Sequence, residues 1–174
     1  VLATQDLAPT VGLGNVSMHL LRARQAWRVR QEASGDAISD APLMRLIGHH
    51  CHVYGVMQAN YPGNPDESTR VFLGENGERD DFLAYEGRPF PAGSIYNVIT
   101  AISALPVLSA LLPDGPPTRY STPAPFGHPG GYPLHIEAGK LAFDLPPGVS
   151  EADAVAFNWA MGKLDGIEAI DADG

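Results

Sequence analysis

Residues 132–146 constrain the fold of this chain more than any other segment, because they read as two strands joined by a tight turn. The segments "YPLHIE" and "KLAFDLP" flank Ala138-Gly139, and inward and outward residues alternate along both. Two such segments separated by two turn residues predict a β-hairpin with antiparallel strands. We therefore expect an antiparallel sheet with helices packed against it.

Other segments predict further strands and helices around this hairpin. The spacing of apolar and capping residues predicts helices over about 16–32, over 94–112 and from Ser150 onwards. Strands are expected at 43–59, 69–75, 81–87 and 167–171, and a Pro/Gly-rich loop is expected from about 113 to 131. Pro106 predicts a kink or a split in the second helix. The sum is a single α+β domain over 1–174, with a mixed, mostly antiparallel sheet of five to six strands and about three helices packed on one face.

The charge and the cysteine count exclude several classes of function. The 174 residues carry a formal net charge of −9, whereas binding to nucleic acid or to an anionic membrane surface needs a surplus of Lys and Arg. The single cysteine, Cys51, excludes an intramolecular disulfide and a Cys-rich zinc site. The longest apolar stretch, 94–113, contains Asn97, Thr100 and Pro106, which indicate a buried helix rather than a membrane span. We therefore expect a cytoplasmic protein that binds neither nucleic acid nor membrane.

The two ends of the chain indicate a piece of a longer protein. The first residue is Val1 rather than methionine. Asp173-Gly174, at the other end, has the form of a type I′ hairpin turn with no second strand after it. We therefore expect the domain to belong to a longer chain.

Three of the six histidines lie within "HHCHVYG" at 49–55. Side chains alternate between the two faces of a strand, so His50, His52 and Tyr54 are expected on one face, and His49 and Cys51 on the other. Three interpretations remain open. The histidines are half-buried and hydrogen-bonded residues of an ordinary strand, they bind a metal, or they act in acid/base catalysis and carboxylate recognition.

A metal ion on this strand would need a third ligand. The His50/His52 pair supplies two imidazoles on one face, which suits Zn²⁺ or Fe²⁺. The candidates for the third ligand are His128, His135 and Glu137. Because the sequence does not fix the distances between these residues, metal binding is kept as an alternative and not as the favoured interpretation.

The segment "PAPFGHPGGYP" at 123–133 is the second candidate site. Gly130 and Gly131 allow the backbone to approach a ligand or to adopt positive φ, and the prolines stiffen the loop. His128 lies at its centre and Tyr132 closes it. The segment is therefore a candidate for substrate binding, against the alternative of a connector shaped to enter the hairpin.

The histidine segment resembles a known family signature. "HHCH" at the end of an apolar strand resembles the HHxHK signature of dihydrodipicolinate reductases, and "GSIYNVITAISALPVL" resembles the helices of their C-terminal domains. More broadly, the chain resembles the substrate and dimerisation half of a dihydrodipicolinate reductase-like or saccharopine dehydrogenase-like oxidoreductase. Val53 stands where the signature has lysine, and the Rossmann half of such enzymes lies outside this chain.

The resemblance implies the substrate-binding and catalytic domain of an NAD(P)-dependent oxidoreductase that acts on an amino-acid-like or carboxylated substrate. The NAD(P) would be bound mainly by a domain outside this chain, and the protein would be a homo-oligomer whose sheet builds the interface. The catalytic residues would be His50, as proton donor, together with His52 and Tyr54. The substrate-binding residues would be His49, His128, Gly130, Gly131, Tyr132 and Asn97. The alternatives are a metal-dependent hydrolase or lyase that uses the His50/His52 pair, and a non-catalytic oligomerisation domain.

Overall fold

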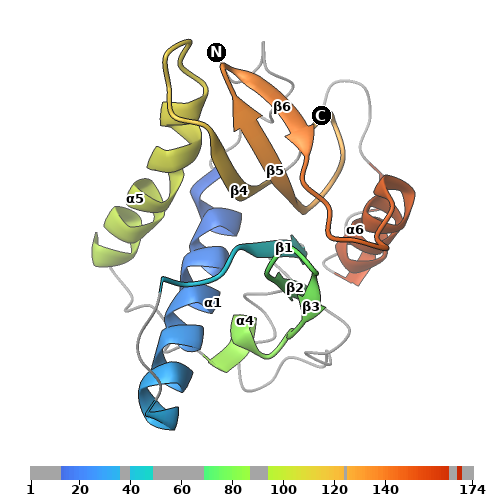
Figure 1. The fold of residues 1–174 in the computed structure, drawn as a ribbon. Coiled ribbons are helices and arrows are strands. Elements are labelled where there is room, and N and C mark those ends of the chain that lie inside the picture. The colour runs from blue at the N-terminus through green and yellow to red at the C-terminus, as the bar shows by residue number, and fades with distance from the viewer. Residues whose placement is uncertain are drawn as a thin grey trace.

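The computed structural model describes residues 13–35, 40–48, 69–86, 94–123, 125–164 and 168–169 (Figure 1). Its helices are α1 (Leu13–Ser34), α4 (Leu83–Glu86), α5 (Ser94–Ala110) and α6 (Glu151–Leu164). Its strands are β1 (Met44–Gly48), β2 (Thr69–Leu73), β3 (Glu78–Arg79), β4 (Thr118–Pro123), β5 (Gly131–Glu137) and β6 (Lys140–Phe143). Within these ranges all strand pairings are antiparallel, in the order β3-β2-β1-β5-β4, with β6 also paired to β5. The predicted α+β fold is therefore confirmed.

The predicted hairpin is formed by β5 and β6. Its turn is made by Ala138, with φ of 49°, and Gly139, with φ of 74°. Positive φ at both central residues is the pattern of a type I′ turn, whose twist matches that of the flanking strands. Glu137 and Lys140 pair directly beside the turn. This local geometry fixes which residues of the two strands face each other.

Two predicted segments take a different form in the structure. Residues 118–123 were predicted as loop but form β4, because all six residues find partners on β5. The predicted strand at 81–87 is wrong, since its central residues form the short helix α4. There the buried carboxylate of Asp81 accepts a hydrogen bond from the Val71 amide (2.9 Å), which turns the chain away from β2.

Three further predictions concern the lengths of elements. β1 covers Met44–Gly48, and the rest of the strand predicted at 43–59 lies outside the described residues. The strand predicted at 167–171 also lies mostly outside them. α5 runs without a break from Ser94 to Ala110 although Pro106 lies inside it, so the predicted split does not occur.

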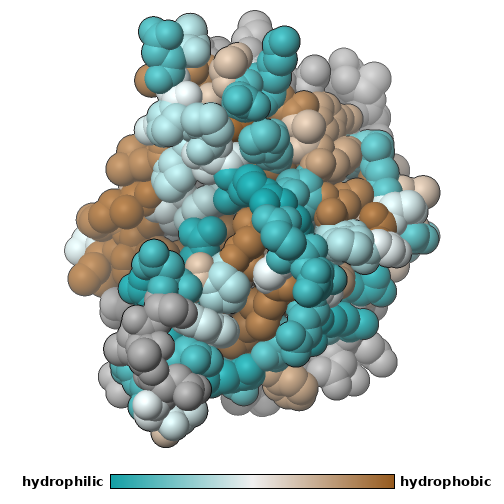
Figure 2. Space-filling view, in the orientation of Figure 1, coloured by the Kyte–Doolittle hydropathy of each residue, from teal (hydrophilic) through white to brown (hydrophobic). Residues whose placement is uncertain are grey.

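Helix α5 packs along α1 and leaves an apolar face uncovered. Ser103 and Val107 are buried on the inner side of α5, with exposed fractions of 2% and 0%. On the outer side, apolar residues gather along the helix, as Figure 2 shows at the left of the molecule.

None of the described helices is both long and apolar enough to cross a membrane. The predicted cytoplasmic location stays a prediction.

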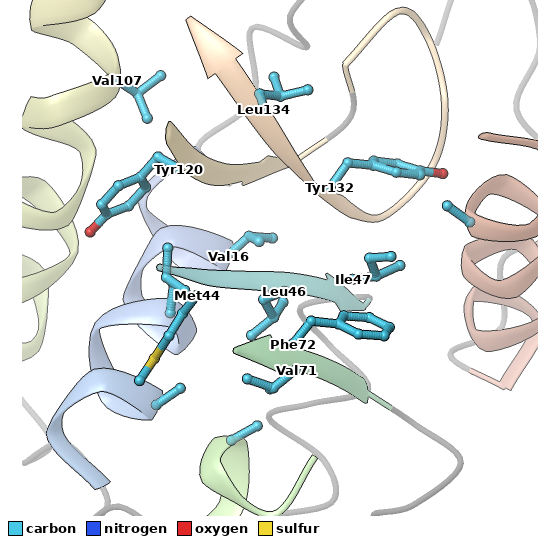
Figure 3. Packing of buried hydrophobic residues seen from close by; sticks show 14 of the residues in the cluster. Val16, Met44, Leu46, Ile47, Val71, Phe72, Val107, Tyr120, Tyr132 and Leu134 are labelled. Atoms are coloured by element: carbon cyan, nitrogen blue, oxygen red, sulfur yellow. The ribbon is translucent and has the colours of Figure 1, made fainter. Parts of the chain in front are cut away.

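The two faces of the sheet carry different helices. Leu46 and Val71 are cross-strand partners on the face that packs against α1 (Figure 3). Ile47 and Arg70 are partners on the opposite face, where the Arg70 guanidinium lies 4.2 Å from the ring of Phe157 in α6. α4 and α5 pack against α1, so these three helices form one layer and α6 forms the other (Figure 1).

The core lies between α1 and the sheet. Its fully buried side chains include Leu20 of α1, Leu46 of β1 and Leu134 of β5, each 0% exposed. Burying each such side chain stabilises the fold by about 1.5–3 kcal/mol. A chain of this length can bury such a core. The core fixes how α1 packs against the strands, and these elements carry the candidate site.

A group of four charged residues joins distant parts of the sheet. Arg45 of β1 has a side chain that is only 4% exposed, and Asp144, just after β6, is 11% exposed. Asp144 accepts hydrogen bonds from Arg119 Nε (2.8 Å) and Nη2 (2.6 Å), and from Arg45 Nη2 (3.2 Å). Glu75, which is 72% exposed, also contacts both arginines.

The pKa of Asp144 reflects two opposing causes. Burial alone raises the pKa of this carboxyl, but the hydrogen bonds and positive charges of Arg119 and Arg45 outweigh burial and hold the pKa below its ordinary value of 3.8. Separate hydrogen bonds from Arg119 and Arg45 lower the pKa of Glu75. The positive charges of the two arginines are therefore compensated by two ionised carboxylates.

Candidate functional site

The residue that precedes the histidine segment pairs with the last residue of the Gly/Pro-rich loop. β1 ends at Gly48, directly before the histidine segment, and Gly48 pairs with Gly131, where the loop 123–131 enters β5. We call this point the Gly48–Gly131 junction. The side chains of His49, His50, His52 and Tyr54 lie outside the described residues, so the structure locates the start of their segment and not their positions.

Close packing at the junction requires glycine. A Cβ atom on Gly131 would lie 2.5 Å from Cγ1 of Val16 in α1 and 2.8 Å from the carbonyl oxygen of Gly48. Gly130 has φ of 82°, and a Cβ there would lie 2.4 Å from Cγ of Asn158 in α6. In the structure these two glycines allow α1, β1 and α6 to approach the loop. Their predicted contact with a substrate stays a prediction.

The loop before the junction has a defined and partly strained shape. Phe126 has φ of 56°, a conformation that costs a non-glycine residue about 1–3 kcal/mol. Its ring packs edge-on against Phe143, with 5.0 Å between ring centroids. The amide of His128 donates a hydrogen bond to the carbonyl oxygen of Pro125 (3.0 Å), which closes a turn. The ring contact and this turn hold the loop in one shape, as a binding loop requires.

His128 is half-buried at the rim of this loop. Its ring centroid lies 6.2 Å from those of Tyr132 and Phe143. Its Nε2 lies 3.7 Å from Oε1 of Glu151, the first residue of α6, and its side chain is 31% exposed. An imidazole that reaches solvent at the rim of a loop can form hydrogen bonds with a polar ligand.

Tyr132 is fixed within the structure. Its side chain points toward α6 (Figure 3), and its hydroxyl donates a hydrogen bond of 2.7 Å to the carbonyl oxygen of Pro129. Burial raises the pKa of Tyr132 to about 12, aided by the charge of Glu151 and opposed by a hydrogen bond with Asn158. The phenol therefore stays protonated at neutral pH and holds the loop against β5, which is a positioning role.

Asn158 is a site residue that the sequence did not reveal. It is 0% exposed, and its Nδ2 donates a hydrogen bond to the carbonyl oxygen of Gly131 (3.0 Å). Its Oδ1 is buried and, among the described residues, has no hydrogen-bond partner. The Oγ1 atoms of Thr69 and Thr122 share this property. Thr69 pairs with Gly48 and Thr122 pairs with Tyr132, so all three oxygens border the junction.

Arg70 is the second residue that sequence reasoning missed. It pairs with Ile47, one position from Gly48, and its guanidinium lies against the ring of Phe157. Burial lowers the pKa of Arg70, and the charge of Arg79 lowers it further. Its Nε is buried and has no hydrogen-bond partner in the described ranges. A guanidinium that is stacked on an aromatic ring is a group that can bind a carboxylate through its planar set of donors.

Two predicted candidates lie away from the junction. Asn97 is exposed on α5, and Figure 1 places α5 and α6 on opposite sides of the molecule. His135 pairs with Ala142, whereas Leu134 pairs with Phe143, against which His128 stacks. His128 and His135 therefore lie on opposite faces of the hairpin and cannot share a metal ion. Across the described part of the chain, no three His, Cys, Asp or Glu residues form a group that could hold a metal.

A hollow of about 510 Å³ lies on the outer side of α1, away from the junction. Its lining residues are Leu21, Arg24, Gln25, Arg28, Ala41 and Ile99. The Arg24 guanidinium also lies 5.1 Å from the centre of the Tyr120 ring, which places it beside β4. The two arginines and the apolar lining could accept an anionic group with an apolar body.

Comparisons with family models, with curated proteins and with solved structures find no match to this chain. The case for a function therefore rests on the residues of the Gly48–Gly131 junction. They bring together Gly48, which precedes the histidine segment, a loop with a half-buried imidazole, and an arginine that is stacked on an aromatic ring.

Proposed function

We propose that this chain is the substrate-binding and catalytic domain of an NAD(P)-dependent oxidoreductase that acts on an amino-acid-like or other carboxylated substrate. The observation that supports the proposal is the pairing of Gly131, at the end of the candidate loop, with Gly48, the residue before the histidine segment. Sites that bind small molecules combine a few convergent polar groups with an apolar wall. The aromatic rings around His128 supply such a wall.

In this proposal each group at the junction has a distinct task. Arg70 binds the substrate carboxylate, with His49 and His52 assisting from the histidine segment. His50 donates the proton, Tyr54 is expected on the same face as His50, and His128 covers the substrate from its preformed loop. NAD(P)H, held by a domain outside this chain, supplies the hydride. The protein works as a homo-oligomer.

The test is the oxidation of NADH and NADPH by the protein that carries this chain, expressed from its complete gene. A panel of 2-oxo and 2-imino carboxylates serves as substrates, and the decarboxylated analogues serve as controls. We expect turnover only with the carboxylated compounds. His50→Gln should abolish turnover, while His135→Gln should leave it unchanged, because His135 is exposed on the opposite face of the hairpin.

Arg70 provides a separate test of substrate binding. Replacing a charged hydrogen-bond donor to a carboxylate raises KM by about tenfold or more. We therefore expect Arg70→Met to raise KM with little change in kcat, and Arg70→Lys to restore part of the affinity. Lys140→Met is the control, since it also removes a positive charge and Lys140 is exposed on β6. Failure to oxidise either cofactor, together with stoichiometric zinc or iron in the purified protein, would instead support the metal-dependent hydrolase or lyase.

A further inference from the structure

Helix α5 and the turn after it carry a continuous line of exposed apolar side chains. We call the following six residues, with their exposed fractions, the α5 stripe: Ile95 (52%), Val98 (53%), Ile102 (55%), Leu105 (54%), Leu108 (41%) and Leu112 (59%). Figure 2 shows this apolar surface along α5. Exposed apolar residues that occur singly are ordinary on protein surfaces, whereas a contiguous patch of this kind marks an interaction site.

The spacing within the α5 stripe is that of a helix–helix seam. Ile95, Val98, Ile102 and Leu105 follow one another within α5 at intervals of three, four and three residues, and Leu112 lies in the turn after the helix ends at Ala110. These intervals are those of the a and d positions of a heptad repeat, which place side chains along one narrow line. Such a line packs against a second helix, because knobs and holes alternate along it.

The charge of the chain favours another copy at this particular surface. The protein carries a net charge of −9, so two copies repel each other over most of their surfaces. α5, by contrast, contains no Asp, Glu, Lys or Arg from Ser94 to Ala110. Two copies that meet through α5 bury no charged side chain of this helix, in keeping with the depletion of charge at interface cores.

The exposed area matches what a stable dimer needs. The exposed fractions of the six residues correspond to about 600 Å² of apolar surface on each copy, and specific interfaces bury at least about 1,000 Å² over both partners. A twofold axis brings the same patch of both copies together, and a single apolar line is complementary to itself. We propose that the protein forms a homodimer in which the α5 stripe of one copy packs against that of the second. This inference does not depend on the proposed reaction.

Sedimentation velocity over a wide range of protein concentrations tests the proposal. We expect the wild type to be dimeric and Ile102→Lys to raise the dimer Kd at least about tenfold, because a lysine at the centre of an apolar interface is left without a partner. Val29→Lys is the matched control, since Val29 is also an exposed apolar residue (57%), but on α1. It should dimerise like the wild type.

Cysteine cross-linking locates the interface even where the lysine variant does not fold. In a Cys51→Ser background, Ile102→Cys should form a disulfide-linked dimer under mild oxidation, while Val29→Cys should not. A monomeric wild type at all concentrations would overturn the proposal and would leave the stripe to another segment or to a different protein. A dimer whose Kd is unchanged by Ile102→Lys, or that cross-links no better through residue 102 than through residue 29, would also overturn it.

Discussion

Replacing Asp144 with asparagine removes the charge that faces two arginines while keeping the shape of the side chain. Asp144 is 11% exposed, and the Arg45 side chain beside it is 4% exposed. Breaking a buried ion pair by neutralising one partner costs about 3–5 kcal/mol, because the other charge stays buried. Arg45 keeps its hydrogen bonds to the Gly74 carbonyl oxygen (2.8 Å) and to Glu75 (3.2 Å). We therefore expect a loss near the lower limit, about 3 kcal/mol.

Equilibrium unfolding in urea at neutral pH measures this loss as a lower transition midpoint with an unchanged m-value. Glu75→Gln is the matched control, because it removes the same charge from the same pair of arginines at an exposed position. Its effect should be much smaller, since exposed ion pairs contribute little to stability. If Asp144→Asn costs less than about 1 kcal/mol, or no more than Glu75→Gln, the inference that the charge of Asp144 is needed to compensate Arg45 and Arg119 is wrong.

The pH dependence of the same two proteins gives an independent check. The pKa of Asp144 is lower in the folded protein than its ordinary value of 3.8. Its stabilising contribution is therefore complete above that value and is lost as the pH falls through the lower folded pKa. The difference in unfolding free energy between wild type and Asp144→Asn should shrink over this acidic range. A difference that stays constant down to the lowest pH at which both proteins fold would contradict the argument.

Three further predictions concern single positions. Gly131→Ala should destabilise the fold by about 2 kcal/mol in thermal or urea unfolding, because the new Cβ meets Val16 at 2.5 Å; an unchanged midpoint would contradict the close approach. Ser150→Ala should lower the free energy of unfolding by about 1 kcal/mol, since Ser150 Oγ accepts a hydrogen bond from the Asp153 amide (3.1 Å) at the start of α6. Unfolding followed by circular dichroism measures this loss. Tyr132 should ionise near pH 12, so stability falls as the pH rises past about 10, where the unfolded tyrosine ionises. Tyr132→Phe should remove this part of the absorbance-monitored titration.

Local sequence patterns predicted those elements that are stabilised by contacts between residues close together in the sequence. The β5–β6 hairpin is set by alternation and a two-residue turn, and α6 by the exchange of hydrogen bonds between Ser150 and Asp153. β4 was missed because TRYSTP lies between two proline- and glycine-rich segments, and its pairing with β5 is what makes it a strand. α4 was missed because the alternation in DFLAYEG resembles a strand, whereas Leu83 and Ala84 are both buried.

The candidate site was predicted in part for the same reason. The loop around His128 was recognisable from its glycines and prolines, which act on the local backbone. Arg70 and Asn158 were not recognisable, because what distinguishes them is contact with residues far away in the sequence. Arg70 lies against Phe157, and Asn158 bonds to Gly131. Such pairs follow from the tertiary fold and leave no periodic pattern in the sequence.

The pairing of Gly48 with Gly131 also bears on the order in which the sheet assembles. Among the described strands, β3-β2-β1 and β4-β5-β6 each consist of neighbours along the chain, and Gly48 with Gly131 is a pair between these two halves. Closing a contact between residues so far apart costs more chain entropy than forming a hairpin, so we expect the two halves to form first and join last. Native-state hydrogen exchange should then show the amides at the junction, those of Gly48 and Gly131, opening at lower free energy than amides inside each half, such as those of Phe72 and Leu134. Equal protection of these amides would contradict the late joining of the two halves. The expected order would make the junction the part of the described sheet whose backbone hydrogen bonds open most readily.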